Sequence, residues 1–377
     1  MAVCHLKLDY GKLSSWASAA AMGPRIAVEG EGEGDNISFR VRLPDNILNH
    51  VLVISGVNYT SGFPLELARG VPMHLRAKLY ESGLRREWWF LAASILRSEA
   101  ESIDQLLGLI DELEAFLHDS KTPRNLKTAI NREEYDMLAS CFPDVQSWEE
   151  YTEDKTKHLS RNTLNLLKRA IIECHRNFYG EYWKRRGPEI QRLAETLKKT
   201  VDIVQPLKAL KNLLNMTVEE NPIVHPVDVF RCGGGIYGVN PNRILCTSDR
   251  WTPALIHLDI AHEYGHILIG QWKMKLSEQI VELARKMEVK RPILLSEVIE
   301  EHVVALIQFK LDLKLTGIRR KTHGYMDNFT FKLAEKAWDK TMESEERDFL
   351  NYMKTLLNRI PLDKEASKEL KSLTTQE

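Results

Sequence analysis

The chain has 377 residues, of which 43% are apolar and 28% charged. This balance is typical of a folded globular protein, with room for one large domain or two to three ordinary ones. Its 52 basic and 53 acidic residues give a formal net charge of −1, which argues against a protein that binds nucleic acid by neutralising phosphates.

Targeting signals and cysteine usage predict a cytoplasmic protein. No apolar run approaches the roughly 20 residues that a membrane span needs, and the first residues lack the basic start and apolar core of a signal peptide. The five cysteines are odd in number and have no close metal-site spacing, which favours a reducing compartment. Cys232 and Cys246 flank a predicted hairpin, so their pairing stays open. The oligomeric state is not indicated.

The first region, residues 1–74, is predicted to be rich in β-structure. The stretch "ISFRVRL" at 37–43 alternates apolar and polar residues, as a half-buried strand does. "VLVISGV" at 51–57 is a short β-branched run that a turn ends, and it is interpreted as a second strand.

Residues 75–214 are predicted to form a helical region, because apolar residues recur there at helical spacing. The stretch "SIDQLLGLIDELEAFLHDS" opens with a capping box formed by Ser102 and Gln105. Pro188 suits the first turn of a helix. Pro206 predicts a bend or a break in the last helix.

The composition changes at about residue 215, where Gly, Pro and β-branched residues become frequent. Ile236–Val239 and Arg243–Thr247 are predicted to be two strands joined by an Asn-Pro-Asn turn. The expected fold is therefore mainly α with a small β-sheet (α+β), and residues 215–377 form the last domain. Helices are expected near 253–272, 276–289, 293–314 and 330–357, with a polar tail that frays.

The stretch "DIAHEYGHILIG" at 259–270 carries the clearest chemical signal. Residues four apart on a helix lie on one face, so His262 and His266 project two imidazoles in the same direction and can hold one zinc ion. Glu263 lies about 100° round the helix, beside the metal, where it can take a proton from water. Burying these groups in an apolar stripe is costly without partners, and a metal supplies one. The alternative is a buried helix whose histidines form hydrogen bonds alone.

The sequence "HEYGH" resembles the zinc-binding helix of the zincin metallopeptidases, over roughly residues 230–330. The Tyr-Gly pair between Glu263 and His266 resembles the motif of the helix-rich oligopeptidase and carboxypeptidase branches of that superfamily. The resemblance implies a zincin-like catalytic domain beside an additional helical region, with one zinc ion per chain. It also implies an edge strand that pairs with extended substrate, a role that suits "NRILCTS" at 242–248.

The same resemblance, to the glutamate-zincin type, implies the third ligand. It assigns that role to Glu297, with Glu301 as the acceptor that fixes the tautomer of a ligand imidazole. Glu300 is the competing ligand, and the choice between Glu297 and Glu300 stays open. These glutamates also fit the solvent-exposed face of an ordinary amphipathic helix. His302 is interpreted as an outer partner or as a core histidine.

A donor to the oxyanion of a tetrahedral intermediate is expected as well. The stretch "KTHGYMDNFTF" at 321–331 offers His323 and Tyr325, and a loop with a packed tyrosine is the alternative. Tyr237 and Tyr264 are weaker candidates.

Together these residues predict a zinc-dependent metallopeptidase that acts on peptides or proteins, without nucleic-acid or membrane partners. One alternative is a zinc-binding but catalytically inactive helical interaction module. Another is a helical interaction protein without metal. The sequence does not indicate the substrate, or whether cleavage is internal or terminal.

Overall fold

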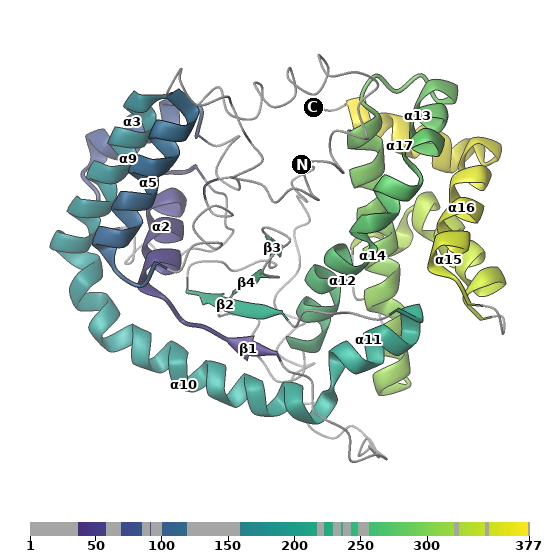
Figure 1. Ribbon diagram of the computed structural model, residues 1–377, viewed down its shortest axis with the longest axis horizontal. Coiled ribbons are helices and arrows are strands. Elements are labelled where there is room, and N and C mark those ends of the chain that lie inside the picture. The colour runs from purple at the N-terminus through teal and green to yellow at the C-terminus, as the bar shows by residue number, and fades with distance from the viewer. Residues whose placement is uncertain are drawn as a thin grey trace.

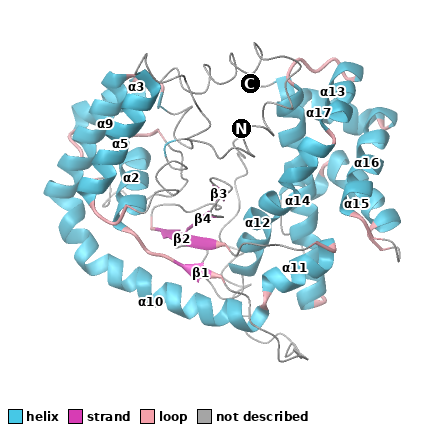
Figure 2. Cartoon of the chain, viewed as in Figure 1, coloured by secondary structure: helices cyan, strands magenta, loops and turns pink. Residues whose placement is uncertain are grey.

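The computed structural model of the chain describes residues 37–57, 69–84, 91, 100–118, 159–216, 222–228, 235–236, 243–247, 256–319, 324–343 and 347–375. Helices make up most of this part of the chain, around a small sheet (Figure 1 and Figure 2). Within these ranges, every helix falls short of the length and apolar character that crossing a bilayer requires.

One group of helices packs around a first apolar core. The π-helical turn η4, His175–Tyr179, continues α9 directly and adds Tyr179 to this core. Figure 1 shows the four helices of the group side by side. They are α2 (Leu43–Ile54), α3 (Met73–Glu81), α5 (Ile103–His118) and α9 (Arg161–Cys174).

A second group packs around a larger core, with α14 at its centre. Helix α14, Pro292–Thr316, contacts α11, α12, α13, α15 and α17. Its residues 303–307 are all buried because neighbours cover it on several sides. The others are α11 (Pro206–Leu214), α12 (Ile256–Lys275), α13 (Ser277–Lys286), α15 (Phe329–Thr341), α16 (Phe349–Arg359) and α17 (Lys364–Thr375), with short 3-10 turns η6 (Gly324–Asp327) and η7 (Ile360–Leu362).

Helix α10, Gly180–Val204, links the two groups and runs beside the sheet (Figure 1). Trp183, near its start, packs against both cores, whereas Ile190 and Leu197 belong to the second core. The two cores therefore meet along α10. The predicted domain boundaries after residues 74 and 214 stay predictions.

The sheet has four strands in the order β1-β2-β4-β3. The predicted hairpin is confirmed in part, since β3 (Gly235–Ile236) pairs antiparallel with β4 (Arg243–Thr247), which has the predicted bounds. Residues 237–242, which include most of the first predicted strand and the Asn-Pro-Asn turn, lie outside the described residues. Strand β2, Ile223–Val227, was not predicted and pairs parallel with β4 and with the two-residue β1, Ser38–Phe39. Pro226 lies inside β2, and prolines are uncommon within strands because they lack an N–H donor.

The predicted strand at 51–57 is wrong, because these residues end helix α2 and its C-terminal turn. Ile47, Leu48, Val51 and Leu52 form pairs four residues apart and are all buried, so burial on one helix outweighs the β preference of a short branched run. Only β1 remains of the strand predicted at 37–43.

The predictions from the capping box and from Pro206 are confirmed, whereas the prediction from Pro188 is not. The capping box is confirmed: Gln105 Oε1 accepts from the Ser102 N–H at 3.1 Å, and Ser102 Oγ accepts from the Gln105 N–H at 3.2 Å. The break at Pro206 is confirmed, with Gln205 at a φ of 49° before α11. Pro188 instead lies inside α10, because burial of the helix's apolar face outweighs the hydrogen bond that proline removes.

The C-terminal segment also differs from expectation. The single helix predicted at 330–357 is divided into α15 and α16, and the Asp348 carboxylate caps α16 by accepting from the N–H groups of Leu350 and Asn351. The tail predicted to fray forms α17, because Ala366 and Leu370 are buried in the second core. Tertiary packing therefore orders a segment that its own composition does not.

A buried ionic cluster joins α2 to the sheet. The Arg42 guanidinium donates to both oxygens of Asp45, at 2.8 and 2.6 Å, and His225 Nδ1 on β2 lies 2.9 Å from Asp45 Oδ2. All three side chains are at most 1% exposed. Burial alone would raise the pKa of Asp45, but His225 and then Arg42 outweigh it and hold the pKa below its ordinary value.

Replacing Asp45 by Asn should lower the free energy of unfolding at pH 7 by about 3–5 kcal/mol, because a buried guanidinium loses its partner. The depressed pKa means that the stabilisation is present above about pH 4 and is lost as the pH falls through the lower folded-state value. Urea unfolding of wild type and variant at pH 7 and pH 3 tests both statements. The control is Asp202→Asn. Asp202 pairs with Lys198, and its side chain is 40% exposed, so this substitution should change the free energy of unfolding by less than about 0.5 kcal/mol. Equal loss at both pH values contradicts the electrostatic explanation.

Candidate metal centre

The site lies between α12 and α14, and their antiparallel contact fixes its geometry. Gln308 Nε2 on α14 donates a hydrogen bond of 3.2 Å to the carbonyl of Leu258, near the start of α12. About two turns further along α12, a Cβ on Gly265 would lie 3.5 Å from Val304, which is one turn earlier on α14. Residue numbers thus rise along one helix as they fall along the other, and the two contacts set the register.

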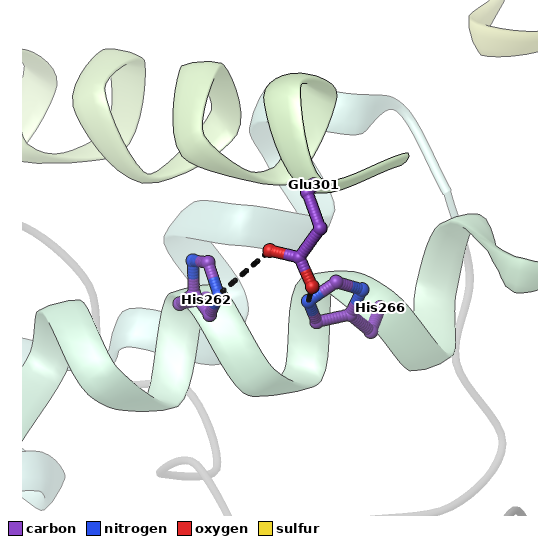
Figure 3. Close-up of side chains that lie close together, drawn as sticks. All are labelled: His262, His266 and Glu301. Carbon is purple, nitrogen blue, oxygen red and sulfur yellow. Dashed lines mark ion pairs between the residues drawn. The ribbon is translucent and has the colours of Figure 1, made fainter. Parts of the chain in front are cut away.

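Glu301 on α14 points between the two histidines of α12 (Figure 3). Its Oε2 lies 3.8 Å from His262 Nε2, and its Oε1 lies 3.6 Å from His266 Nε2. The ring planes cross at 83°, with centroids 5.1 Å apart. One ligand atom from each residue lies within 4.8 Å of the others. A tetrahedral zinc ion with bonds of 2.0–2.1 Å holds its ligand atoms about 3.3 Å apart, so these three side chains fit such an ion after a small inward movement.

His266 is held from its other side by Glu300. Its Nδ1 lies 2.7 Å from Glu300 Oε1, and the other oxygen of Glu300 pairs with the ammonium of Lys273. An ionised carboxylate only accepts hydrogen bonds, so Nδ1 carries the proton. Nε2, which faces Glu301, is therefore the nitrogen that would bind a cation once it gives up its own proton.

The charges around His266 stabilise a positive charge. Burial alone lowers the pKa of His266, but Glu301, then Glu300 and Glu263, raise it to about 9. Burial raises the pKa of Glu300, yet Lys273 and His266 outweigh it and lower the value to about 2. Burial raises the pKa of Glu301. These surroundings suit a cation.

One side of the cluster is accessible to solvent. The side chain of Glu301 is 42% exposed, whereas that of Glu300 behind it is 8% exposed. Three protein ligands with one open direction is the arrangement of a catalytic rather than a structural zinc site. Glu263 follows His262 directly on α12 and is buried.

The structure places Glu301, rather than Glu297, beside the two imidazoles, and it places Glu300 at Nδ1 of His266, where Glu301 was expected as the acceptor. The role of Glu297 as third ligand stays a prediction. Glu297 lies four residues before Glu301 on α14, about one helical turn or 5.4–6 Å along the axis. Because the helices are antiparallel, this displacement is toward the C-terminal end of α12. No signal in the sequence singles out Glu301, because the choice depends on how α12 and α14 align, and the contact at Gly265 leaves room for a Cβ at 3.5 Å from Val304.

Of the two oxyanion-donor candidates in 321–331, the structure describes Tyr325. Tyr325, in η6, lies against His302, with ring centroids 4.6 Å apart, and its catalytic role stays a prediction. His302 is a core histidine: Nδ1 donates to the Val298 carbonyl at 2.7 Å, and Asn328 donates to Nε2 at 3.0 Å. His323 lies outside the described residues.

The remaining candidates have structural outcomes. Tyr264 is buried in the second core, which leaves its hydroxyl no access to a substrate. The edge of the sheet beside α12 is β3, the first strand of the predicted hairpin, rather than β4, which carries "NRILCTS" and lies between β2 and β3. Tyr237 and Cys232 lie outside the described residues, as does the side chain of Cys246.

Comparison with known proteins adds no relative. No protein-family model matches the chain, and neither the curated proteins nor the solved structures compared with it gave a match. The resemblance to zincins therefore rests on the sequence motif alone.

Replacing Glu301 by Gln should weaken zinc binding by more than the roughly 10–100-fold that loss of an outer partner costs, because an anionic ligand becomes a neutral amide. Glu297→Gln, one turn away on the same helix, is the matched control and should bind zinc within about 3-fold of wild type. Competition with a chromophoric chelator measures both affinities. The opposite ranking would mean that the register of α12 and α14 in the metal-bound protein is not the one described.

Proposed function

We propose that the chain is a zinc-dependent metallopeptidase. The observation that carries the proposal is the convergence of His262, His266 and Glu301 from two packed helices, with an exposed side left for a further ligand. Two imidazole nitrogens and one carboxylate form a ligand set that zinc favours in hydrolytic enzymes.

A zinc ion held there would act as a Lewis acid and lower the pKa of a water molecule. Glu263 is the general base of the proposal. It takes a proton from the attacking water and delivers it to the nitrogen of the leaving amine. Its place one residue after His262 would put it beside the ion rather than on it, and its charge contributes to the raised pKa of His266.

The proposed substrate is a peptide in extended conformation. Strand β3 is an edge of the sheet and contacts α12, the helix that carries both histidines. An extended backbone added to such an edge gains main-chain hydrogen bonds without much dependence on side chains. Zinc and, in the proposal, Tyr325 stabilise the oxyanion.

Replacing Glu263 by Gln should leave zinc bound and lower kcat/KM by about 10²–10⁴-fold, the contribution of a positioned general base. A mixture of short peptides, with products identified by mass spectrometry, supplies the assay because the substrate is unidentified. Glu278→Gln, at an exposed position of α13, is the control and should cleave like wild type.

The rival functions give different results in the same experiment. Stoichiometric zinc in the wild type without any turnover would favour the inactive zinc-binding module. Protein purified without zinc or any other metal, and unable to take zinc up, would favour the helical interaction protein. Unchanged turnover in Glu263→Gln would show that another residue is the base.

A further inference from the structure

Lys273 is a buried lysine close to the candidate metal site, although it is not one of the three candidate ligands. Its side chain is 11% exposed, although it lies near the end of α12, two residues before the exposed Lys275. Lysines are rarely buried unless they are paired. The ammonium of Lys273 forms an ion pair with Glu300 Oε2, on the side of the cluster away from solvent.

This ion pair extends the contacts of the metal centre by one more residue. Glu300 receives the Nδ1–H of His266 on one oxygen and the ammonium of Lys273 on the other. Its carboxylate is thus held at both ends. The next residue, Glu301, points about 100° further round α14, toward Nε2 of the same imidazole.

Glu300 and Glu301 are neighbours on α14, so either carboxylate could in principle be the one that binds the cation. Glu300 and Glu301 are chemically identical ligands within reach of one imidazole, on its two nitrogens. If Glu300 turned toward the cation, His266 would lose the acceptor that fixes its ring. An ammonium that holds the second oxygen of Glu300 opposes that rotation, since breaking a buried ion pair is costly.

We propose that Lys273 is a positioning residue of the metal centre: it anchors Glu300, which keeps His266 Nε2 directed at the cation and leaves Glu301 as the carboxylate ligand. The inference rests on the proposed metal binding but not on peptidase activity. It assigns Lys273 no contact with the metal or the substrate.

The test is a double-mutant cycle on metal affinity. The variants are Lys273→Met, Glu300→Gln and the two combined, with Lys275→Met as the exposed control on the same helix. Zinc affinity is measured by chelator competition, and visible absorption of the cobalt-loaded proteins reports the ligand set. Lys273→Met should weaken zinc binding about 10–100-fold, as loss of an outer partner does, and should change the cobalt spectrum. In the Glu300→Gln background the same substitution should have less than about a 2-fold effect, because the residue acts through Glu300.

Two outcomes would overturn the inference. One is a Lys273→Met protein that binds zinc within about 2-fold of wild type with an unchanged cobalt spectrum. The other is an equal loss of affinity with and without Glu300, which would mark a general structural effect. Thermal unfolding of the metal-free proteins identifies a folding defect, and Lys273→Gln then replaces Lys273→Met in the same cycle.

The wild-type measurement separates this inference from the proposed function. A wild type without zinc affinity refutes both. A wild type that binds zinc, combined with a Lys273→Met variant of equal affinity, refutes the role of Lys273 alone.

Discussion

The antiparallel contact between α12 and α14 is the constraint on which the rest of the site depends. Gly265 of α12 faces Val304 of α14, and a Cβ on Gly265 would lie in ordinary van der Waals contact with that valine, at 3.5 Å. A helix pair can slide only in steps of about one turn, 5.4 Å, without disrupting its interdigitated side chains. The contact therefore decides which residue of α14 meets the two histidines, and its register selects Glu301.

Polar groups across the same interface reinforce this register. Gln308 donates to the Leu258 carbonyl, Asp312 lies 3.4 Å from His257 Nε2, and Glu300 bonds His266. Each of these groups is buried or nearly so, and a buried polar group that loses its partner costs about 1–3 kcal/mol. A shift by one turn would separate all of these pairs together, so they specify one alignment more strongly than apolar packing alone.

The wider fold keeps these two helices rigid. Helix α14 lies at the centre of the second core and is covered by neighbouring helices on several sides, while α11 and the sheet lie against α12 (Figure 1). Sites built on packed helices hold their ligands more accurately than sites on loops. Helix α10 also contacts α12, but the contacts described assign neither α10 nor the first core a direct part in the cluster.

The sequence alone determined several local features of this protein. The spacing of His262 and His266 placed both rings on one helix face, since that depends only on helical periodicity. The capping box at Ser102, the break at Pro206 and the β3–β4 hairpin were likewise readable, because each arises within a few residues. Only the tertiary structure decided that residues 51–54 belong to a helix, that α17 is ordered, and that Glu301 rather than Glu297 faces the histidines. Those outcomes depend on burial against distant segments and on how two helices align, and no local pattern encodes an alignment to within one helical turn.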